Sequence, residues 1–177
     1  EATKQAFLVR NAEVRDIPIM RAPASSFLEA GTLDELAGRI DVDQALAWER
    51  PGQVGDTIWM GAIDKDGTAV SFIQSLYWEF GSGVISPRTG VLLQNRGASF
   101  SLNPANKNRL APGRKPFHTL VPGYAQFDDG RRLVYGTMGG EGQPQTMGAV
   151  FARYANYGYG LQQAITAPRW LLGRTWG

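Results

Sequence analysis

The stretch "GDTIWMGAIDKDGTAVSF" (residues 55–72) places apolar side chains at every second position on both sides of a short turn, namely Ile58, Met60 and Ala62 before it and Val70 and Phe72 after it. A period of two residues indicates β-strands, and the lysine, aspartate and glycine in its middle suit a tight turn. We therefore expect a hairpin with strands over 57–64 and 68–77. Its first strand opens on Thr57, directly after the acidic residue Asp56 and after more than fifty residues of helix-like sequence.

The composition predicts a globular domain. Of the 177 residues, 43% are hydrophobic and 19% are charged, which supplies apolar material for a core and too little charge for a disordered chain. No apolar run approaches the ~18 residues of a membrane helix, and no signal peptide is visible, so we expect a cytoplasmic protein without a membrane partner. The chain has no cysteine, which excludes disulfides, thiolate zinc sites and a cysteine nucleophile but fixes no compartment.

Charge is distributed unevenly about Thr57. Residues 1–56 hold ten acids and six bases, a net charge of −4, whereas residues 57–177 hold six acids and twelve bases, a net charge of +6. The stretch "NKNRLAPGRK" (106–115) is basic, but it lacks the interleaved aromatic residues of a nucleic-acid site, and we expect no nucleic-acid partner. A basic half that handles a small anion, or that docks an acidic partner subunit, is the favoured interpretation.

The first 56 residues are typical of helices. Thr32 is followed three residues later by Glu35, which is the spacing of a capping box at the start of a helix. The same spacing recurs with Asp41 and Gln44. We expect helices over 3–15, 32–40 and 41–48.

The sequence after the first hairpin continues with strands and then returns to a helical pattern. We expect further strands over 90–94, 119–127 and 132–137. Asp129 and Gly130 form the turn between the last two strands. Beyond residue 140 the apolar residues recur at helical spacing, and a last short helix covers about 161–166. The apolar face of the first of these helices consists of Met147, Val150, Phe151 and Tyr154. This order of elements predicts an α+β domain.

Few residues are available for catalysis or metal binding. His118 is the single histidine, and a lone histidine is more often structural than catalytic. With no cysteine and few clustered acids, we expect no metal site and no organic cofactor. The segment "GTMGGEGQPQ" (136–145) follows an expected strand and precedes an expected helix, so the N–H groups of Gly139 and Gly140 can form a phosphate cradle or an oxyanion hole. A tight strand-to-helix turn is the alternative interpretation of these glycines.

Several segments together resemble one family. They occur in the order found in the catalytic subunit of γ-glutamyltransferase-like N-terminal-nucleophile hydrolases, and they are "TIWMGAIDKDGTAVSF", "FGSGV", "GVLLQNR", "KPFHTLVP", "GTMGGEGQPQ" and "ITAPRW". The resemblance covers residues 55–177 strongly and the first 54 residues less specifically. It implies the α+β fold of that family, a four-layer αββα sandwich.

The resemblance also implies two chains made from one precursor. The family cuts itself directly before its nucleophile, which here places the cleavage between Asp56 and Thr57. Residues 1–56 would then be the C-terminal helical part of the large subunit, and residues 57–177 the catalytic small-subunit region, truncated at its C-terminus. The remainder of the large subunit would be a partner, and the assembly a homodimer of such heterodimers. Separate chains would also explain the change of charge at Thr57.

The same resemblance assigns catalytic residues. Cleavage would free the α-amine of Thr57, which has a pKa near ~8 and can act as the base for its own hydroxyl. Ser75 lies where the family places a hydroxyl that orients the nucleophile, and Gly139 and Gly140 match the pair that forms the oxyanion hole. One residue would thus supply both nucleophile and base, in a chain with one histidine and no cysteine.

The substrate-binding positions depart from the γ-glutamyl pattern. Tyr77, Arg96 and Ser99 replace an asparagine, a glutamine and an aspartate that grip the γ-glutamyl group. His118 and Thr119 replace two serines that hold its α-carboxylate. Without the aspartate a buried ammonium group would have no acceptor, which is costly, whereas Arg96 suits a carboxylate. This pattern resembles the oxamate amidohydrolase branch, so we expect a small anionic amide as substrate, with oxamate giving oxalate and ammonia.

Other interpretations stay open. Within the family, the alternatives are a γ-glutamyl hydrolase or transferase and a cephalosporin- or glutaryl-type acylase. Outside catalysis, the alternative is an unprocessed, inactive fragment with a structural or binding role, because Thr57 has no free amine while its bond to Asp56 is intact. For Arg96 the alternative role is a surface or intersubunit ion pair, and for Tyr77 it is packing in the core.

Overall fold

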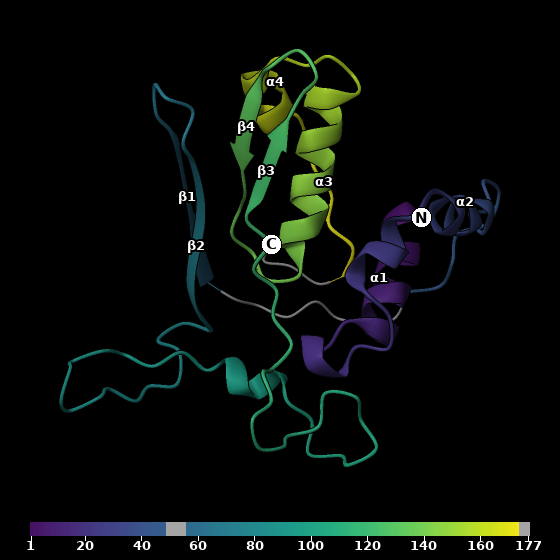
Figure 1. The fold of residues 1–177 in the computed structure, drawn as a ribbon. Coiled ribbons are helices and arrows are strands. Elements are labelled where there is room, and N and C mark those ends of the chain that lie inside the picture. Colours follow the sequence, from purple (N-terminus) through teal and green to yellow (C-terminus); the bar gives the residue numbers. More distant parts are fainter. Residues whose placement is uncertain (49–55, 174–177) are drawn as a thin grey trace. The chain divides into compact units, whose positions relative to one another are not determined.

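The computed structural model describes residues 1–48 and 56–173 (Figure 1). The chain divides into two compact units. The first unit combines Glu1–Arg50 with Arg96–His118, and the second combines Pro51–Asn95 with Thr119–Gly177. The fold therefore does not divide the chain simply at Thr57, because residues 96–118 group with the N-terminal part.

The described residues of the first unit are mainly helical. Its elements are α1 (Ala2–Glu13), α2 (Ala30–Gly38) and short 3-10 helices at Ile17–Ile19, Ala24–Leu28 and Arg96–Ser99. The helices expected at 3–15 and 32–40 are confirmed, but the capping box is wrong. α2 begins before Thr32, and the hydroxyl of this residue donates to the carbonyl of Ser26 (3.1 Å) instead of capping the helix.

The helix expected at 41–48 is wrong. Asp41 does accept hydrogen bonds from the backbone N–H groups of Asp43 (2.8 Å) and Gln44 (3.2 Å), as a helix cap would. The chain then stays irregular, and residues 41–47 are exposed. Because short helices depend on packing for their stability, an isolated aspartate turn forms here without the helix that it predicts.

The basic stretch 106–115 packs against the end of α1 within the first unit. The Nζ of Lys107 donates to the backbone carbonyl of Asn11. The backbone N–H of Lys115 donates to the carboxylate of Asp16 over 3.1 Å. The Lys107 side chain and the Lys115 backbone therefore tie this stretch to the N-terminal part of the unit.

The described strands lie in the second unit. Its elements are β1 (Asp56–Ile63), β2 (Ala69–Tyr77), β3 (Gly123–Gln126), β4 (Arg132–Tyr135), α3 (Gly142–Ala155) and α4 (Leu161–Thr166). β1 pairs with β2, and β3 pairs with β4, each as an antiparallel hairpin. Both expected hairpins and both expected helices are confirmed. The strand expected at 90–94 is wrong, since this segment belongs to a loop with a single bridge between Ile85 and Leu92.

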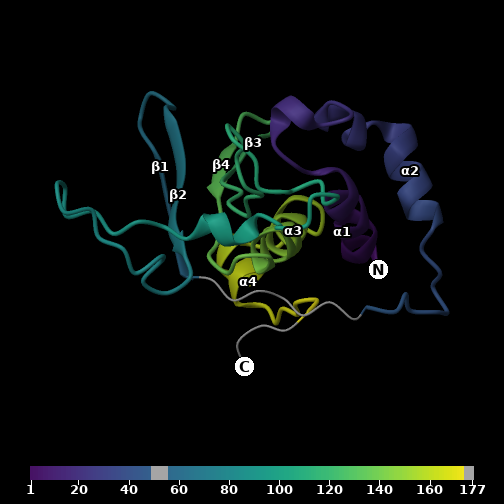
Figure 2. The same cartoon turned by 90° about the horizontal axis from the view of Figure 1, so that it is seen from below.

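The hairpins and helices of the second unit form three layers. β3 and β4 lie between the β1–β2 hairpin and α3 in two perpendicular views (Figures 1 and 2). Tyr135 of β4 stacks on Phe151 of α3, with 5.2 Å between ring centroids, while the next residue, Gly136, faces Trp59 of β1. A Cβ atom at Gly136 would lie 2.2 Å from the Trp59 ring, so this close approach requires glycine. The order β, β, α corresponds to three of the four layers that the resemblance implies.

Candidate active site

Thr57 lies at the start of β1 and contacts Ser75 of β2. Thr57 is 9% exposed, and its Oγ1 donates a hydrogen bond to Ser75 Oγ over 2.9 Å. The same Ser75 oxygen accepts the backbone N–H of Tyr77, also over 2.9 Å. A hydroxyl oxygen can accept two hydrogen bonds, so Ser75 can hold the threonine oxygen in one position. The structure thus brings the expected nucleophile and its expected orienting hydroxyl together.

A β-bulge produces this contact. Asp56 pairs with Tyr77, but Ile58 pairs with Gln74, so β2 has one residue more than β1 in this interval. Tyr77 has a φ of 79°, in the left-handed region that residues other than glycine rarely adopt, and it is 4% exposed. Such a backbone costs of order 1–3 kcal/mol and persists where the surrounding structure fixes it. The bulge and this strained residue lie opposite the bond between Asp56 and Thr57.

An open hollow of about 350 Å³ gives access to this hydroxyl pair. It is lined by Thr57, Ile58, Gln74, Ser75, Leu76, Trp78, Glu79 and Phe80. Asn95 fixes the segment after β2, since its Oδ1 accepts the N–H of Trp78 (3.1 Å) and its own N–H donates to the carbonyl of Leu76 (3.1 Å). The hollow therefore gives a small molecule a path to Thr57, and the hydrogen bonds of Asn95 hold the segment on one side of this path.

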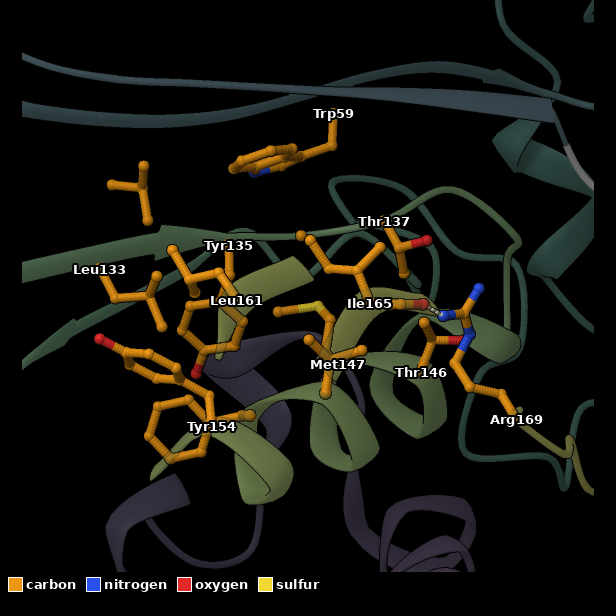
Figure 3. Close-up of a pocket in the computed structure, with 14 residues that line it drawn as sticks. Trp59, Leu133, Tyr135, Thr137, Thr146, Met147, Tyr154, Leu161, Ile165 and Arg169 are labelled. Carbon is orange, nitrogen blue, oxygen red and sulfur yellow. Dashed lines mark hydrogen bonds between the residues drawn. The ribbon is translucent and has the colours of Figure 1, made fainter. Parts of the chain in front are cut away.

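A second cavity, of about 320 Å³, is lined by residues of β1, β4, α3 and α4 and contains none of the expected site residues (Figure 3). Trp59 lies on one side of it, and Met147 and Tyr154 of α3 lie on the other. Most of its lining is apolar, and Arg169 at its edge donates to the carbonyl of Ile165. We therefore assign this cavity to the packing of the layers rather than to the active site.

Gly139 and Gly140 lie in the turn before α3. Their φ angles are 110° and 52°, which favours glycine at both positions. The carbonyls of this pair close the turn, accepting the N–H groups of Gly142 (2.7 Å) and Gln143 (3.2 Å). Among the described turns and loops, no backbone carbonyl accepts a hydrogen bond from the N–H group of Gly139 or Gly140. Two backbone donors at the start of a 14-residue helix can stabilise an oxyanion.

Trp59 lies on the same face of β1 as Thr57 and packs close to the chain that leads into this glycine turn. Side chains alternate along a strand, so Thr57 and Trp59 share one face of β1. Trp59 packs against Gly136, which precedes Gly139 by three residues. The expected nucleophile and the expected oxyanion hole therefore belong to neighbouring layers of the same unit.

Arg96 and His118 belong to the first unit, while Tyr77 and Thr119 belong to the second. Arg96 is 4% exposed. The pKa of His118 lies below its ordinary value of 6.5, first because burial of part of the ring disfavours the charged form, and second because of the positive charge of Arg96. Arg96 therefore places a positive charge close enough to His118 to act on its protonation within the first unit.

Two buried glutamines of α3 were not expected from the sequence. Gln143 is 0% exposed and Gln145 is 8% exposed, although both lie in the glycine-rich segment that the sequence singles out. Periodicity gives no sign that these polar side chains are buried in the first turn of a helix. Both lie within five residues after Gly140, and this closeness to the glycine pair is the sequence feature that could have identified them.

The described residues contain no group of three or more His, Cys, Asp or Glu side chains that could hold a metal ion. In the same part of the chain, no helix combines the length and the apolar character needed to cross a membrane.

Comparison with known proteins identifies relatives of the whole chain. The Gamma-glutamyltranspeptidase family model matches residues 1–177. The oxamate amidohydrolase proenzyme of Klebsiella pneumoniae is 53% identical over 177 residues, which are 100% of this chain and 34% of that protein. The glutathione hydrolase-like YwrD proenzyme of Bacillus subtilis is 47% identical over 178 residues, with the same coverage of 100% and 34%. The chain thus spans about a third of the length of these curated relatives.

Solved structures show the same relationship. The crystal structure of cephalosporin acylase from Bacillus halodurans is 37% identical, with a TM-score of 0.85 over 98% of this chain and 32% of that chain. A gamma-glutamyltranspeptidase from Pseudomonas nitroreducens is 29% identical, with a TM-score of 0.55 over 66% of this chain and 64% of that chain. Together with the described helices and strands, these likenesses confirm the α+β fold of the N-terminal-nucleophile hydrolases. The chain, including its first 54 residues, belongs to the gamma-glutamyltranspeptidase family.

Proposed function

We propose that the protein containing this chain is a self-processing amide hydrolase with Thr57 as its nucleophile. The observation that carries this proposal is the hydrogen bond from Thr57 Oγ1 to Ser75 Oγ (2.9 Å) beside an open hollow. The names of two relatives as proenzymes support it. In this proposal the chain separates into residues 1–56 and 57–177, the rest of the large subunit is a partner, and two such heterodimers assemble.

The first unit would hold the two products of cleavage together. It contains residues from both sides of the proposed cut, namely the N-terminal helices and the segment 96–118. Lys107 binds the backbone of Asn11, and the N–H of Lys115 binds Asp16. These contacts do not depend on an intact bond before Thr57.

Self-cleavage would begin with attack of Thr57 Oγ1 on the carbonyl carbon of Asp56. The peptide C–N bond breaks, an ester forms between the two residues, and the proton lost by the hydroxyl passes to the nitrogen, which becomes the α-amine of Thr57. Water then hydrolyses the ester. The bulge supports this proposal because it presents Ser75 Oγ to the attacking oxygen.

Turnover would use the freed α-amine as a general base. The amine takes the hydroxyl proton as Thr57 Oγ1 attacks the amide carbon of the substrate, and the N–H groups of Gly139 and Gly140 bind the oxyanion. The proton then passes to the leaving nitrogen, which departs as ammonia. Water, activated by the same amine, hydrolyses the acyl-enzyme ester and releases the acid.

We propose a small anionic amide, oxamate in particular, as the substrate. Arg96 is buried and lies close enough to His118 to lower its pKa, and a guanidinium can hold a carboxylate through two hydrogen bonds. Thr119 would add a hydroxyl, and Tyr77 would line the site. The name of the 53% identical relative supports oxamate. A cephalosporin-type acylase is the second candidate, because a solved acylase matches nearly the whole chain.

The full-length protein is assayed on oxamate, its neutral analogue oxamide, a γ-glutamyl amide and a glutaryl amide. We expect kcat/KM to be highest for oxamate. A preference for the γ-glutamyl or glutaryl amide would contradict the proposed substrate and leave the enzyme class intact. A full-length chain that stays uncut and inactive on all four would contradict the enzyme class and favour a structural or binding role.

A further inference from the structure

Gln143 is the second residue of α3 and is completely buried. Its Oε1 accepts the backbone N–H of Val121 over 3.4 Å. Its Nε2 is also buried, and within the described part of the chain no atom accepts a hydrogen bond from it. Most buried polar groups are hydrogen-bonded, so an amide nitrogen in this state points to a ligand or a bound water.

Gln145, two residues along the same helix, shows that the fold can satisfy a buried glutamine. Its Nε2 donates to the carbonyls of Glu141 (3.3 Å) and Leu172 (3.2 Å), and its Oε1 accepts the N–H of Leu172 (2.6 Å). Its side-chain oxygen and nitrogen thus both have partners inside the second unit. The Nε2 of Gln143 therefore lacks an acceptor because of where this residue lies, and not because acceptors are scarce around this helix.

Gln143 is hydrogen-bonded to two segments that the proposed function assigns to the substrate, to one through its carboxamide and to the other through its backbone. Its bond to Val121 ties it to the chain just after Thr119, which is 8% exposed. Its own N–H donates to the carbonyl of Gly140, in the turn proposed as the oxyanion hole. The N-terminal turn of a helix carries partial positive charge, which favours an anionic oxygen beside it.

We propose that Gln143 is a substrate-binding residue whose Nε2 donates a hydrogen bond to a carboxylate oxygen of the anionic amide, and afterwards to the same oxygen of the product. This inference rests on the proposed function and adds a binding residue to it. The ligand would supply the acceptor that the buried donor lacks. Because the donor contacts the carboxylate rather than the reacting carbonyl, its loss affects binding more than the chemical step.

The test compares Gln143→Met with Gln145→Met in the full-length protein. Methionine keeps the length and approximate volume of glutamine and removes the donor. Loss of a hydrogen bond to a charged group corresponds to roughly 10–100-fold in affinity. In Gln143→Met the KM for oxamate and the inhibition constant of oxalate should rise together by about that factor, with kcat and self-cleavage little changed. Gln145→Met should instead lower the melting temperature and leave KM nearly unchanged.

The outcomes separate this inference from the proposed function. If Gln143→Met keeps the wild-type KM for oxamate and the wild-type inhibition by oxalate, the inference is wrong and the proposed function stands. A loss confined to kcat also overturns it, because the donor would then serve the oxyanion. Wild-type protein that neither hydrolyses oxamate nor binds oxalate overturns this inference together with the proposed substrate, and the amide panel then decides the enzyme class. Should the methionine variant fail to fold, Gln143→Glu keeps the shape, repels the carboxylate, and must weaken oxalate binding at least as much.

Discussion

Removal of the Ser75 hydroxyl tests the geometry around Thr57. In Ser75→Ala, Thr57 Oγ1 and the N–H of Tyr77 each lose an acceptor at 2.9 Å. Tyr77 is 4% exposed and has a left-handed backbone, so weakening its anchor should destabilise the fold by about 1–3 kcal/mol. The nucleophile also loses its fixed position, and misplacement by ~1 Å can cost on the order of 10²-fold in rate. We expect slower self-cleavage and a kcat lower by roughly 10–100-fold.

Ser71→Ala is the matched control on the same strand. Ser71 Oγ accepts the indole N–H of Trp59 (3.0 Å) and donates to the carbonyl of Tyr135 (3.4 Å), so it also makes two hydrogen bonds. Its removal should lower stability by a similar amount while cleavage and kcat stay near wild type.

The assay follows both variants of the full-length protein by gel, by thermal unfolding and by ammonia release from oxamate. If Ser75→Ala cleaves itself and turns over at the wild-type rate, Ser75 does not orient the nucleophile. Equal losses of rate in both variants would also refute the reasoning, because the effect would then be general destabilisation of β2.

Three further perturbations address the proposed anion-binding residues and the proposed oxyanion hole. Arg96→Ala should raise the KM for oxamate by roughly 10–100-fold and leave the KM for oxamide nearly unchanged, since a charge-assisted contact is worth about 1.5–3 kcal/mol. Arg96→Lys should recover only part of the loss. An equal rise in KM for both amides would assign Arg96 a structural role. The pKa of His118 is below 6.5 in the folded chain, so its protonation opposes folding. The stability of wild type relative to His118→Gln should therefore fall as the pH decreases below ~6.5 and stay constant at higher pH, and a difference that does not change with pH at all would contradict this. Gly140→Ala forces a side chain onto a φ of 52° and should reduce kcat by at least about tenfold in folded, cleaved protein, whereas full turnover would argue against the oxyanion hole.

The second unit could be predicted largely from local patterns. Two-residue alternation and turn glycines predict its hairpins, and Gly67 and Gly130 indeed have φ angles of 85° and 86° in the two turns. The helical face that contains Phe151 packs on β4, as its spacing suggests. Local patterns are sufficient here because each element buries one face against its neighbour.

Two features of the structure depend on non-local contacts. The segment 90–94 has a strand-like sequence, but the backbone of Leu93 bonds to Ser82 and Val84 within an irregular loop. Grouping of residues 96–118 with the N-terminal helices depends on contacts such as that of Lys107, which no local pattern reveals.

The sequence predicts which residues belong to the candidate site, but it does not predict their contacts or their burial. The resemblance places Thr57 and Ser75 in the site, but their contact depends on a bulge that shifts the pairing of two strands. The burial of Gln143 depends on the chain near Val121, 22 residues away in sequence. Pairing shifts and burial of this kind are set by tertiary packing, so a reading of local sequence does not reveal them.

The most direct test of the account is the mass and N-terminal residue of each chain obtained from the full-length expressed protein. We predict two chains, the smaller of which begins at Thr57, and a single uncut chain in Thr57→Ala. Cleavage at another bond, normal processing of Thr57→Ala, or an uncut wild-type protein that still hydrolyses oxamate would contradict the assignment of Thr57 as the self-released nucleophile.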